Sequence, residues 1–112
     1  MHLINLTPHD VVIFGQTPHD APEMNELVRL HKSPNPARVT MTEARVGEVG
    51  GVPVFQAEVG ETTNLPTPNG CFWIVSRVVA EANPSRGDLL IPHHTVRDSK
   101  GRIIGCKSLA RV

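Results

Sequence analysis

Residues 71–92 combine two short apolar runs with a helix-forming segment, and they constrain the fold of this chain more than any other part of it. The first run, Phe72–Val75, has the length and the aromatic and β-branched content of a buried strand. Ser76 follows it as a typical helix N-cap residue, and Pro84 stops the helix that begins there. A strand followed by a short helix is therefore expected.

A second short apolar run, Asp88–Ile91, follows the helix, and Pro92 is expected to end it. Because neighbouring side chains of a strand point to opposite faces, Phe72 or Trp73 must enter the core. The other ring is expected to project outward, where it would fill a subunit contact or stack on a base. We interpret this strand, helix and strand as the centre of the domain.

Other apolar runs predict strands on both sides of this centre. The two runs at the amino end flank a turn-forming Thr-Pro-His-Asp, which favours a hairpin or a bulged strand. The run at 52–59 contains a proline that places it at a sheet edge, and Val52, Val54 and Ala57 or Val59 are expected to face inward. Together the expected strands cover residues 3–6, 11–14, 38–46, 52–59, 72–75, 88–91 and 102–106, with a turn at 98–101 and an extension over 108–112.

Residues 16–36 have no clear apolar period and contain four prolines, which predicts a loop with one helical turn around Glu23–Leu30. A loop of this length is uncommon inside a compact domain and is usually functional or mobile. It is therefore a candidate lid over a binding site.

These elements predict a single α+β domain over residues 1–112. The expected sheet is mainly antiparallel, with about six or seven short strands and one short helix. Parallel strands need crossover connections, and the chain has too few helices to supply them. At 12.2 kDa the chain has room for one modest core.

Composition limits the class of protein. Apolar residues make up 39% of the chain and charged residues 20%, which is neither a disordered nor a membrane composition. No apolar segment approaches the length of a membrane span, and the first residues lack the features of a signal peptide. We therefore expect a cytoplasmic protein, in which Cys71 and Cys106 are free thiols.

Charge is balanced over the whole chain but not along it. Eleven basic and eleven acidic residues give a formal net charge of zero, which argues against non-specific binding of nucleic acid. Residues 97–112 hold five basic residues and one acid, whereas residues 41–61 hold four glutamates and one arginine. This polarity fits an anion site or a basic-to-acidic contact between subunits, and solvated surfaces are the simpler explanation for any single charge.

Candidate catalytic and metal-binding residues form no familiar pattern. The six histidines include adjacent His93 and His94, which point to opposite faces of an extended segment, and there is no Cys-x-x-Cys or His-x-x-x-His. Cys71 and Cys106 lie in apolar surroundings that disfavour a reactive thiolate. The glycines form no phosphate-binding loop. No metal, no cofactor and no catalytic nucleophile is expected.

A weaker anion-binding device lies at the start of the expected helix. If Ser76 is the N-cap, the first N–H groups of the helix and the side chain of Arg77 form a small positive pole. Other arginines follow the helix or flank the last turn, and arginine suits bidentate binding of phosphate. The alternative is that the arginines pair with nearby carboxylates. The further arginines are Arg86, Arg97 and Arg102, and the carboxylates are Glu81, Asp88 and Asp98.

Short motifs outside residues 16–36 are distinctive in combination. They read Ile4-Asn5-Leu6-Thr7-Pro8-His9, Ile74-Val75-Ser76, Val79-Ala80, Pro84-Ser85-Arg86-Gly87-Asp88-Leu89, Val96-Arg97-Asp98 and Gly101-Arg102-Ile103-Ile104-Gly105-Cys106. Together they resemble a small family of uncharacterised proteins encoded by bacteriophages and their bacterial hosts. The resemblance carries no catalytic signature and implies a location in the host bacterial cytosol.

The phage context suggests a function. Some small, neutral, oligomeric phage proteins sequester nucleotide signals of bacterial immunity, such as cyclic dinucleotides or cyclic ADP-ribose isomers, and this chain is similar to them in size and character. We therefore expect a non-enzymatic homo-oligomer that captures a small phosphorylated nucleotide in a pocket between subunits. The residues expected to bind the ligand are Thr7, His9, Ser76, Arg77, Arg86, Arg97 and Asp98.

Two other functions stay open. An accessory or protein-interaction module would use an exposed edge strand such as residues 52–59. A nucleotide-cleaving enzyme would use His9 or His93 as general acid or base, because imidazole titrates near neutral pH.

Overall fold

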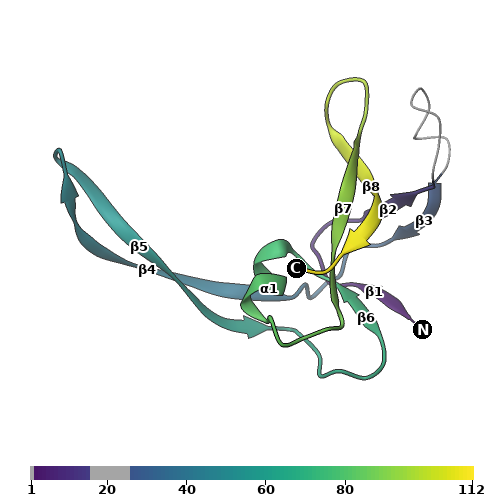
Figure 1. The fold of residues 1–112 in the computed structure, drawn as a ribbon, viewed down its shortest axis with the longest axis horizontal. Helices are drawn as coiled ribbons and strands as arrows, with labels where there is room; N and C mark the ends of the chain where they lie inside the picture. Colours follow the sequence, from purple (N-terminus) through teal and green to yellow (C-terminus); the bar gives the residue numbers. More distant parts are fainter. Residues whose placement is uncertain (1, 16–25) are drawn as a thin grey trace.

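The computed structural model describes residues 2–15 and 26–112, which contain eight strands and one helix (Figure 1). Strands are far more abundant than helix, so the class is only roughly α+β, and the strands exceed the expected six or seven. In chain order the elements are β1 (Leu3–Asn5), β2 (Val11–Phe14), β3 (Glu26–Leu30), β4 (Arg38–Val49), β5 (Val52–Thr63), β6 (Phe72–Ile74), α1 (Arg77–Ala82), β7 (Leu89–Arg97) and β8 (Ile103–Ala110).

Six strands form a mixed sheet in the order β1-β6-β7-β8-β2-β3, and β4 and β5 form a separate two-stranded ribbon. Strand β6 is parallel to both β1 and β7, and β2 is parallel to β8. The expectation of a mainly antiparallel sheet was therefore wrong for these pairs. The crossover from β6 to β7 uses helix α1, whereas the parallel partners β1 and β6, and β2 and β8, are joined through several intervening elements.

The predicted centre is confirmed as β6, α1 and β7. The N–H groups of Trp73 and Val75 donate to the carbonyl oxygens of Asp88 and Leu90, each at 2.9 Å, which joins β6 to β7. Ser76 occupies the N-cap of α1. No helix in the described ranges is long and apolar enough to cross a membrane.

Two expectations at the amino end were wrong. The runs that became β1 and β2 do not form a hairpin, because β6, β7 and β8 lie between them in the sheet. Within the expected loop, residues 26–30 form β3, which pairs antiparallel with β2, so there is no helical turn at that point. The rest of that helical turn, and residues 16–25 of the candidate lid, lie outside the described residues.

Pro92 does not end its strand, because β7 continues to Arg97. The carbonyl of Leu90 faces β6, where it accepts a hydrogen bond from Val75. Backbone groups alternate along a strand, so position 92 faces the same side as position 90 but lies beyond the end of β6. The missing N–H of proline therefore removes no ladder hydrogen bond there.

The core lies on both faces of the sheet around β6. Trp73 is only 5% exposed and packs with Val75 and with Val79 of α1 in the principal cluster. Ile74 points to the opposite face and packs with Val11 and buried Cys106. The expectation that Phe72 or Trp73 enters the core is confirmed, with Trp73 inside and Phe72 half-buried.

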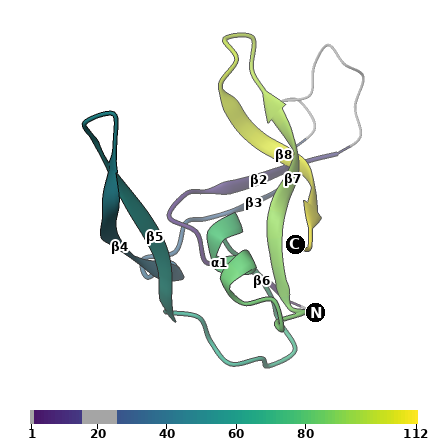
Figure 2. The same cartoon turned by 60° about the vertical axis from the view of Figure 1, so that its left-hand side comes forward.

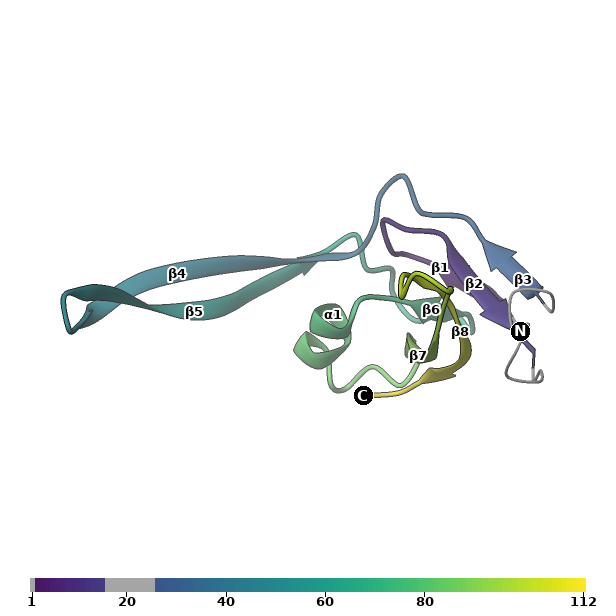
Figure 3. The same ribbon diagram turned by 90° about the horizontal axis from the view of Figure 1, so that it is seen from above.

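The β4–β5 ribbon, hereafter the arm, projects from the body of the molecule (Figures 1 and 3). Its strands have twelve residues each and pair antiparallel from Arg38↔Thr63 to Val49↔Val52. The radius of gyration is 17.3 Å, well above the roughly 13 Å typical of a compact chain of this length. The expected inward orientation of Val52, Val54 and Val59 was wrong, because all three are exposed on the arm.

The base of the arm is fastened to the body. Asn83, the C-cap of α1, donates from Nδ2 to Thr62 Oγ1 at 2.9 Å and to the Val79 carbonyl at 2.8 Å. Asn64 donates from its side chain to the carbonyl of Pro36 at 3.2 Å. Helix α1 therefore lies between the base of the arm and β7 (Figure 2).

Glycine is required at position 105, where β8 runs close to β2. A Cβ atom on Gly105 would lie 2.5 Å from the carbonyl oxygen of Val12 and 2.6 Å from a ring carbon of Phe14. We predict that Gly105→Ala lowers the free energy of unfolding by about 2–3 kcal/mol, because the β2 backbone must move. Urea denaturation measures this change.

Gly87→Ala is the matched control, because a Cβ atom at Gly87 would meet nothing within 4 Å. Its effect should stay within about 0.5 kcal/mol. Equal effects of the two substitutions would contradict the close approach of β8 to β2.

Candidate functional site

A cleft of about 740 Å³ opens between the loop after β1, the start of α1 and the β7–β8 hairpin. Its walls are mostly apolar, with Val75, Ile91, Ile104 and Cys106 among them. Its polar lining comes from three separate segments of the chain. These polar residues are Thr7, His9, Asp10, Ser76, Arg77 and Thr95.

The buried amide of Asn5, 6% exposed, holds the loop that forms one wall. Its Nδ2 lies 2.8 Å from the carbonyl oxygen of His9, 3.1 Å from that of Leu30 and 3.2 Å from that of His31, with two protons shared among the three acceptors. Its Oδ1 accepts a hydrogen bond from the N–H of Thr7 at 2.9 Å. One side chain therefore binds this loop to the end of β3 and fixes the position of the wall.

Thr7 is buried and serves the same loop. Its hydroxyl lies 2.7 Å from Asn5 Oδ1 and 2.8 Å from the His9 carbonyl oxygen, with one proton for the two acceptors. The N–H of His9 donates back to this hydroxyl at 3.4 Å. Thr7 therefore lines the cleft, but its polar atom is engaged within the protein. Its contribution to binding is the shape of the wall.

Asp10 places a negative charge in the same wall. Its Oδ1 accepts a hydrogen bond from the N–H of Lys32 at 2.8 Å. Its Oδ2 lies 4.0 Å from Arg29 Nη1 and 3.9 Å from His31 Nδ1. These groups draw the carboxylate toward β3 and partly offset its charge.

Ser76 and Arg77 form the opposite wall at the start of α1. Ser76 has the extended backbone of an N-cap, but its hydroxyl makes no capping hydrogen bond and is exposed. Arg77 is 71% exposed and donates from Nε to Glu81 Oε1 at 2.8 Å. This contact leaves Nη1 and Nη2 available to a ligand. Because α1 has only six residues, the expected positive pole depends on this guanidinium rather than on a helix dipole.

Arg86 lies away from the cleft and forms the ion pair that the sequence left as an alternative. Its Nε and Nη2 donate to the two carboxylate oxygens of Asp88 at 2.9 Å each, and Nη2 also donates to the Pro66 carbonyl at 2.8 Å. Both side chains are 17% exposed. The hydrogen bonds from Arg86 lower the pKa of Asp88, although burial opposes this, and the pKa of Arg86 is raised in turn.

Trp73 lies beside this pair. Its indole N–H has no hydrogen-bond partner of good geometry among the described residues, but it makes a smaller contribution to the lowered pKa of Asp88. The pair therefore belongs to the packing of β6 against β7 rather than to the cleft.

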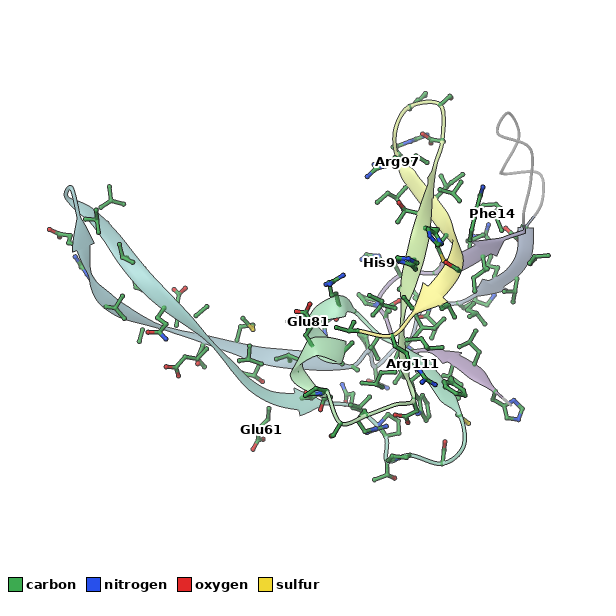
Figure 4. All side chains as sticks on the ribbon, in the orientation of Figure 1. His9, Phe14, Glu61, Glu81, Arg97 and Arg111 are labelled. Atoms are coloured by element: carbon green, nitrogen blue, oxygen red, sulfur yellow. The ribbon has the colours of Figure 1, made fainter. Side chains whose placement is uncertain are left out.

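Arg97 also lies outside the cleft, near the tip of the β7–β8 hairpin (Figure 4). Asp98 follows it in the turn between the two strands and does not line the cleft either. Arg97 donates to the carbonyl of Gly101 at 2.7 Å. Asp98 accepts hydrogen bonds from the N–H groups of Lys100 and Arg102 and from Arg102 Nε, which lowers its pKa. The predicted turn at 98–101 is thus confirmed, with a 3.0 Å bond from the Gly101 N–H to the Asp98 carbonyl.

The structure brings together four of the seven expected ligand-binding residues: Thr7, His9, Ser76 and Arg77 line one cleft. His93 is exposed and does not line it. The rings of His93 and His94 have centroids 4.1 Å apart, so the expectation of opposite orientations was wrong. His94 has a left-handed backbone (φ +54°), which breaks the alternation of the strand, and its Nδ1 lies 2.7 Å from Ser108 Oγ.

Three residues that hold or line this cleft, Asn5, Thr95 and Ile104, are not among the site residues predicted from the sequence. The signal for Asn5 was a polar residue inside the apolar run Leu3–Leu6, where an unpaired amide would be costly. Nothing in the sequence places Thr95 or Ile104 at the same cleft as Ser76, because their proximity depends on the strand order. Both cysteines are free, and burial raises the pKa of the Cys106 thiol. No three potential metal ligands cluster in residues 2–15 and 26–112.

The chain matches no family model, no curated protein and no solved structure. The geometry of the cleft is therefore the basis for assigning a function.

Asn5 should be essential for the cleft wall. We predict that Asn5→Ala lowers the free energy of unfolding by about 3 kcal/mol, because several buried hydrogen bonds are lost and their partners stay buried. The control is Asn35→Ala, at an exposed position in the loop between β3 and β4. Urea denaturation of both variants measures the difference, and similar values for the two would contradict the role of Asn5.

The Arg86–Asp88 pair should make stability depend on acid pH. Folding lowers the pKa of Asp88, so its charged carboxylate stabilises the protein at pH values above the ordinary pKa of 3.8. This stabilisation is lost as the pH falls through the folded-state pKa. We predict that Asp88→Asn costs about 3 kcal/mol at pH 7 and progressively less as the pH falls below 3.8 through the lowered folded-state pKa of Asp88, because the carboxyl then loses its charge.

Urea denaturation between pH 2 and pH 7 tests this dependence. Glu81→Gln is the control, because it breaks an exposed pair with Arg77 and should cost less than about 1 kcal/mol. A constant cost of Asp88→Asn over the whole pH range would rule out the ion pair as its cause.

Proposed function

We propose that the chain is a non-enzymatic binding protein that holds a small phosphorylated nucleotide in the cleft. The observation that carries this proposal is the meeting of Arg77, Ser76 and His9, from two distant segments, around one mostly apolar hollow. Its volume of about 740 Å³ lies within the roughly 300–1,000 Å³ typical of small-molecule sites.

The two kinds of lining suit the two parts of a nucleotide. An apolar wall, including Val75, Ile91 and Ile104, offers dispersion contacts to the flat face of a base. The terminal nitrogens of Arg77 and the hydroxyl of Ser76 offer donors to a phosphate on one side of the opening. The carboxylate of Asp10 disfavours a phosphate on the other side and accepts hydrogen bonds from a ribose or an exocyclic amine instead.

Sequestration is favoured over cleavage by the chemistry of the lining. Cys106 is buried with a raised thiol pKa, which suppresses its nucleophilic form. Ser76 and His9 come from opposite walls, and no hydrogen bond joins them within the described residues. A general base acting on a nucleophile would need such a contact.

The biological setting that we propose is capture of a nucleotide signal of bacterial immunity, such as a cyclic dinucleotide or a cyclic ADP-ribose isomer, by a phage protein in the host cytosol. It is supported by the resemblance of the motifs to phage proteins and by the small size and neutral charge of the chain. Cyclic nucleotides combine phosphate with flat bases, which is the combination that the cleft offers.

Thermal unfolding with a panel of cyclic dinucleotides, cyclic ADP-ribose isomers and linear nucleotides tests this function. A ligand at about one hundred times its dissociation constant should stabilise the protein by roughly 2.7 kcal/mol. Arg77→Gln should weaken binding of that ligand about tenfold or more, because a charge-assisted phosphate contact is lost. Calorimetry of wild type and variant gives the dissociation constants.

Arg102→Gln is the matched control for Arg77→Gln. Arg102 is 72% exposed and pairs through Nε with a carboxylate four residues away, as Arg77 does, but it does not line the cleft. The affinity of the Arg102→Gln variant for the ligand should stay close to that of the wild type. Absence of binding to every compound in the panel would refute the proposal, and recovery of a cleaved ligand would show an enzyme instead.

A protein-interaction module is the second candidate function. The specific observation in its favour is the arm, whose edges and apolar side chains face solvent. An exposed ribbon edge can pair with a further strand. Affinity capture from infected or host cells, with the arm truncated in the control, tests this candidate.

A further inference from the structure

The arm carries an unusual share of the exposed apolar surface. Every residue from position 40 to 61 is exposed, yet seven of the thirteen large hydrophobic side chains exposed in the described residues lie there. Exposed apolar side chains that are gathered in one region often mark an interaction surface, whereas single scattered ones do not. The seven are Met41, Val46, Val49, Val52, Val54, Phe55 and Val59.

The pairing register assigns these side chains to two faces. Residues paired directly across a ribbon share a face, as do alternate residues of one strand. One face combines apolar side chains with charges of both signs, and Phe55 is 51% exposed on it. We call it the Phe55 face, and it consists of Met41, Glu43, Arg45, Glu48, Pro53, Phe55, Ala57 and Val59.

A two-stranded ribbon of this kind is marginally stable when it stands alone in water. The hydrogen bonds that fasten the arm to the body lie at its base, at Thr62 and Asn64. Beyond them, no part of residues 2–15 and 26–112 covers the Phe55 face, because every residue of it is exposed. A partner that buries this face would supply the missing stabilisation.

Charge favours the β7–β8 hairpin as that partner. The arm, Arg38–Thr63, holds four glutamates and two arginines, whereas residues 97–107 at the end of the hairpin hold four cations and one acid. The Phe55 face itself carries two of these glutamates and Arg45, which pairs with Glu48 at 2.9 Å, so its net charge is negative and Glu43 is its unpaired acid within the described residues. The single acid, Asp98, is occupied by hydrogen bonds within its own turn. The hairpin therefore offers a positive surface to an acidic arm.

Within one chain the arm and the hairpin project from the body in different directions (Figures 1 and 2). The contact must then join two chains. In a two-fold arrangement, the arm of each copy packs on the hairpin of the other copy. Both Phe55 faces are then covered at once. Each copy would contribute the eight residues of its Phe55 face and residues 97–107 of its hairpin, which together come close to the roughly 20–30 residues that each partner contributes to a standard interface.

We propose that the Phe55 face of the arm seats on the β7–β8 hairpin of a second copy of this chain, in a reciprocal assembly. The observations behind this proposal are separate from those behind nucleotide binding, although the hairpin also forms one wall of the cleft. It predicts an oligomer held by apolar contacts near Phe55 and Val59 and by attraction between the glutamates of the arm and the cations of the hairpin.

The test is the mass of the purified chain in solution, measured by light scattering and sedimentation over a range of concentrations. The wild type should exceed the 12.2 kDa monomer and should dissociate more readily at high salt. Phe55→Glu should raise the dissociation constant about thirtyfold or more, because a charge would replace a buried aromatic contact. Leu27→Glu, at an apolar site 68% exposed on β3, should leave the mass unchanged.

Charge reversal tests whether the Phe55 face contacts the β7–β8 hairpin of the second copy. Glu43→Lys with Glu48→Lys should weaken assembly, and adding Lys100→Glu with Lys107→Glu on the same chain should restore it. Val59→Glu provides a second apolar variant if Phe55→Glu does not fold by circular dichroism. A monomer at all concentrations would overturn the proposal, as would an oligomer that survives both apolar variants or a charge reversal without restoration.

Discussion

The short strand β6 is shared between two neighbours, and the rest of the structure depends on that sharing. The N–H groups of Phe72 and Trp73 donate in turn to His2 beside β1 and to Asp88 beside β7, and Val75 continues toward β7. Its side chains alternate likewise, with Trp73 and Ile74 filling the cores on opposite faces. Because β6 fixes β1, β7 and the start of α1 together, the three walls of the cleft meet at its carboxyl end.

The parts of this fold that could be predicted are those set by local chemistry. The run ending at Val75, the N-cap at Ser76 and the stop at Pro84 together predict strand, helix and their order. Strand β3 was missed because the prolines around it favour a loop, and its hydrogen bonds come from β2. The inward orientation of Val52 and Val54 was wrong because alternation in a strand predicts two faces but does not say that a core covers either one.

In the candidate site, the sequence likewise does not show which arginine is available to a ligand. Arg77 and Arg86 both have a carboxylate close by in the chain, and both form an ion pair with it. What separates them is the surroundings: Arg86 is held by both oxygens of Asp88 and by a carbonyl, whereas Arg77 keeps two donors at the edge of the cleft. Tertiary packing decides which guanidinium is free, and residue types alone cannot. Asn5 is the converse case, since its place in an apolar run is a visible signal of a buried role.

The parallel pairings of the sheet set an order of events on the ribosome. Leu3 pairs with Phe72 and Ile13 with Cys106, so these hydrogen bonds of β1 and β2 must wait for strands made much later, although β2 can pair earlier with β3. Such distant pairings make folding slow, because loop closure precedes any gain in contacts. The arm, by contrast, joins residues that are close in sequence and can form as soon as it emerges. During synthesis the two strands of the arm can therefore pair, with marginal stability, before the body is complete.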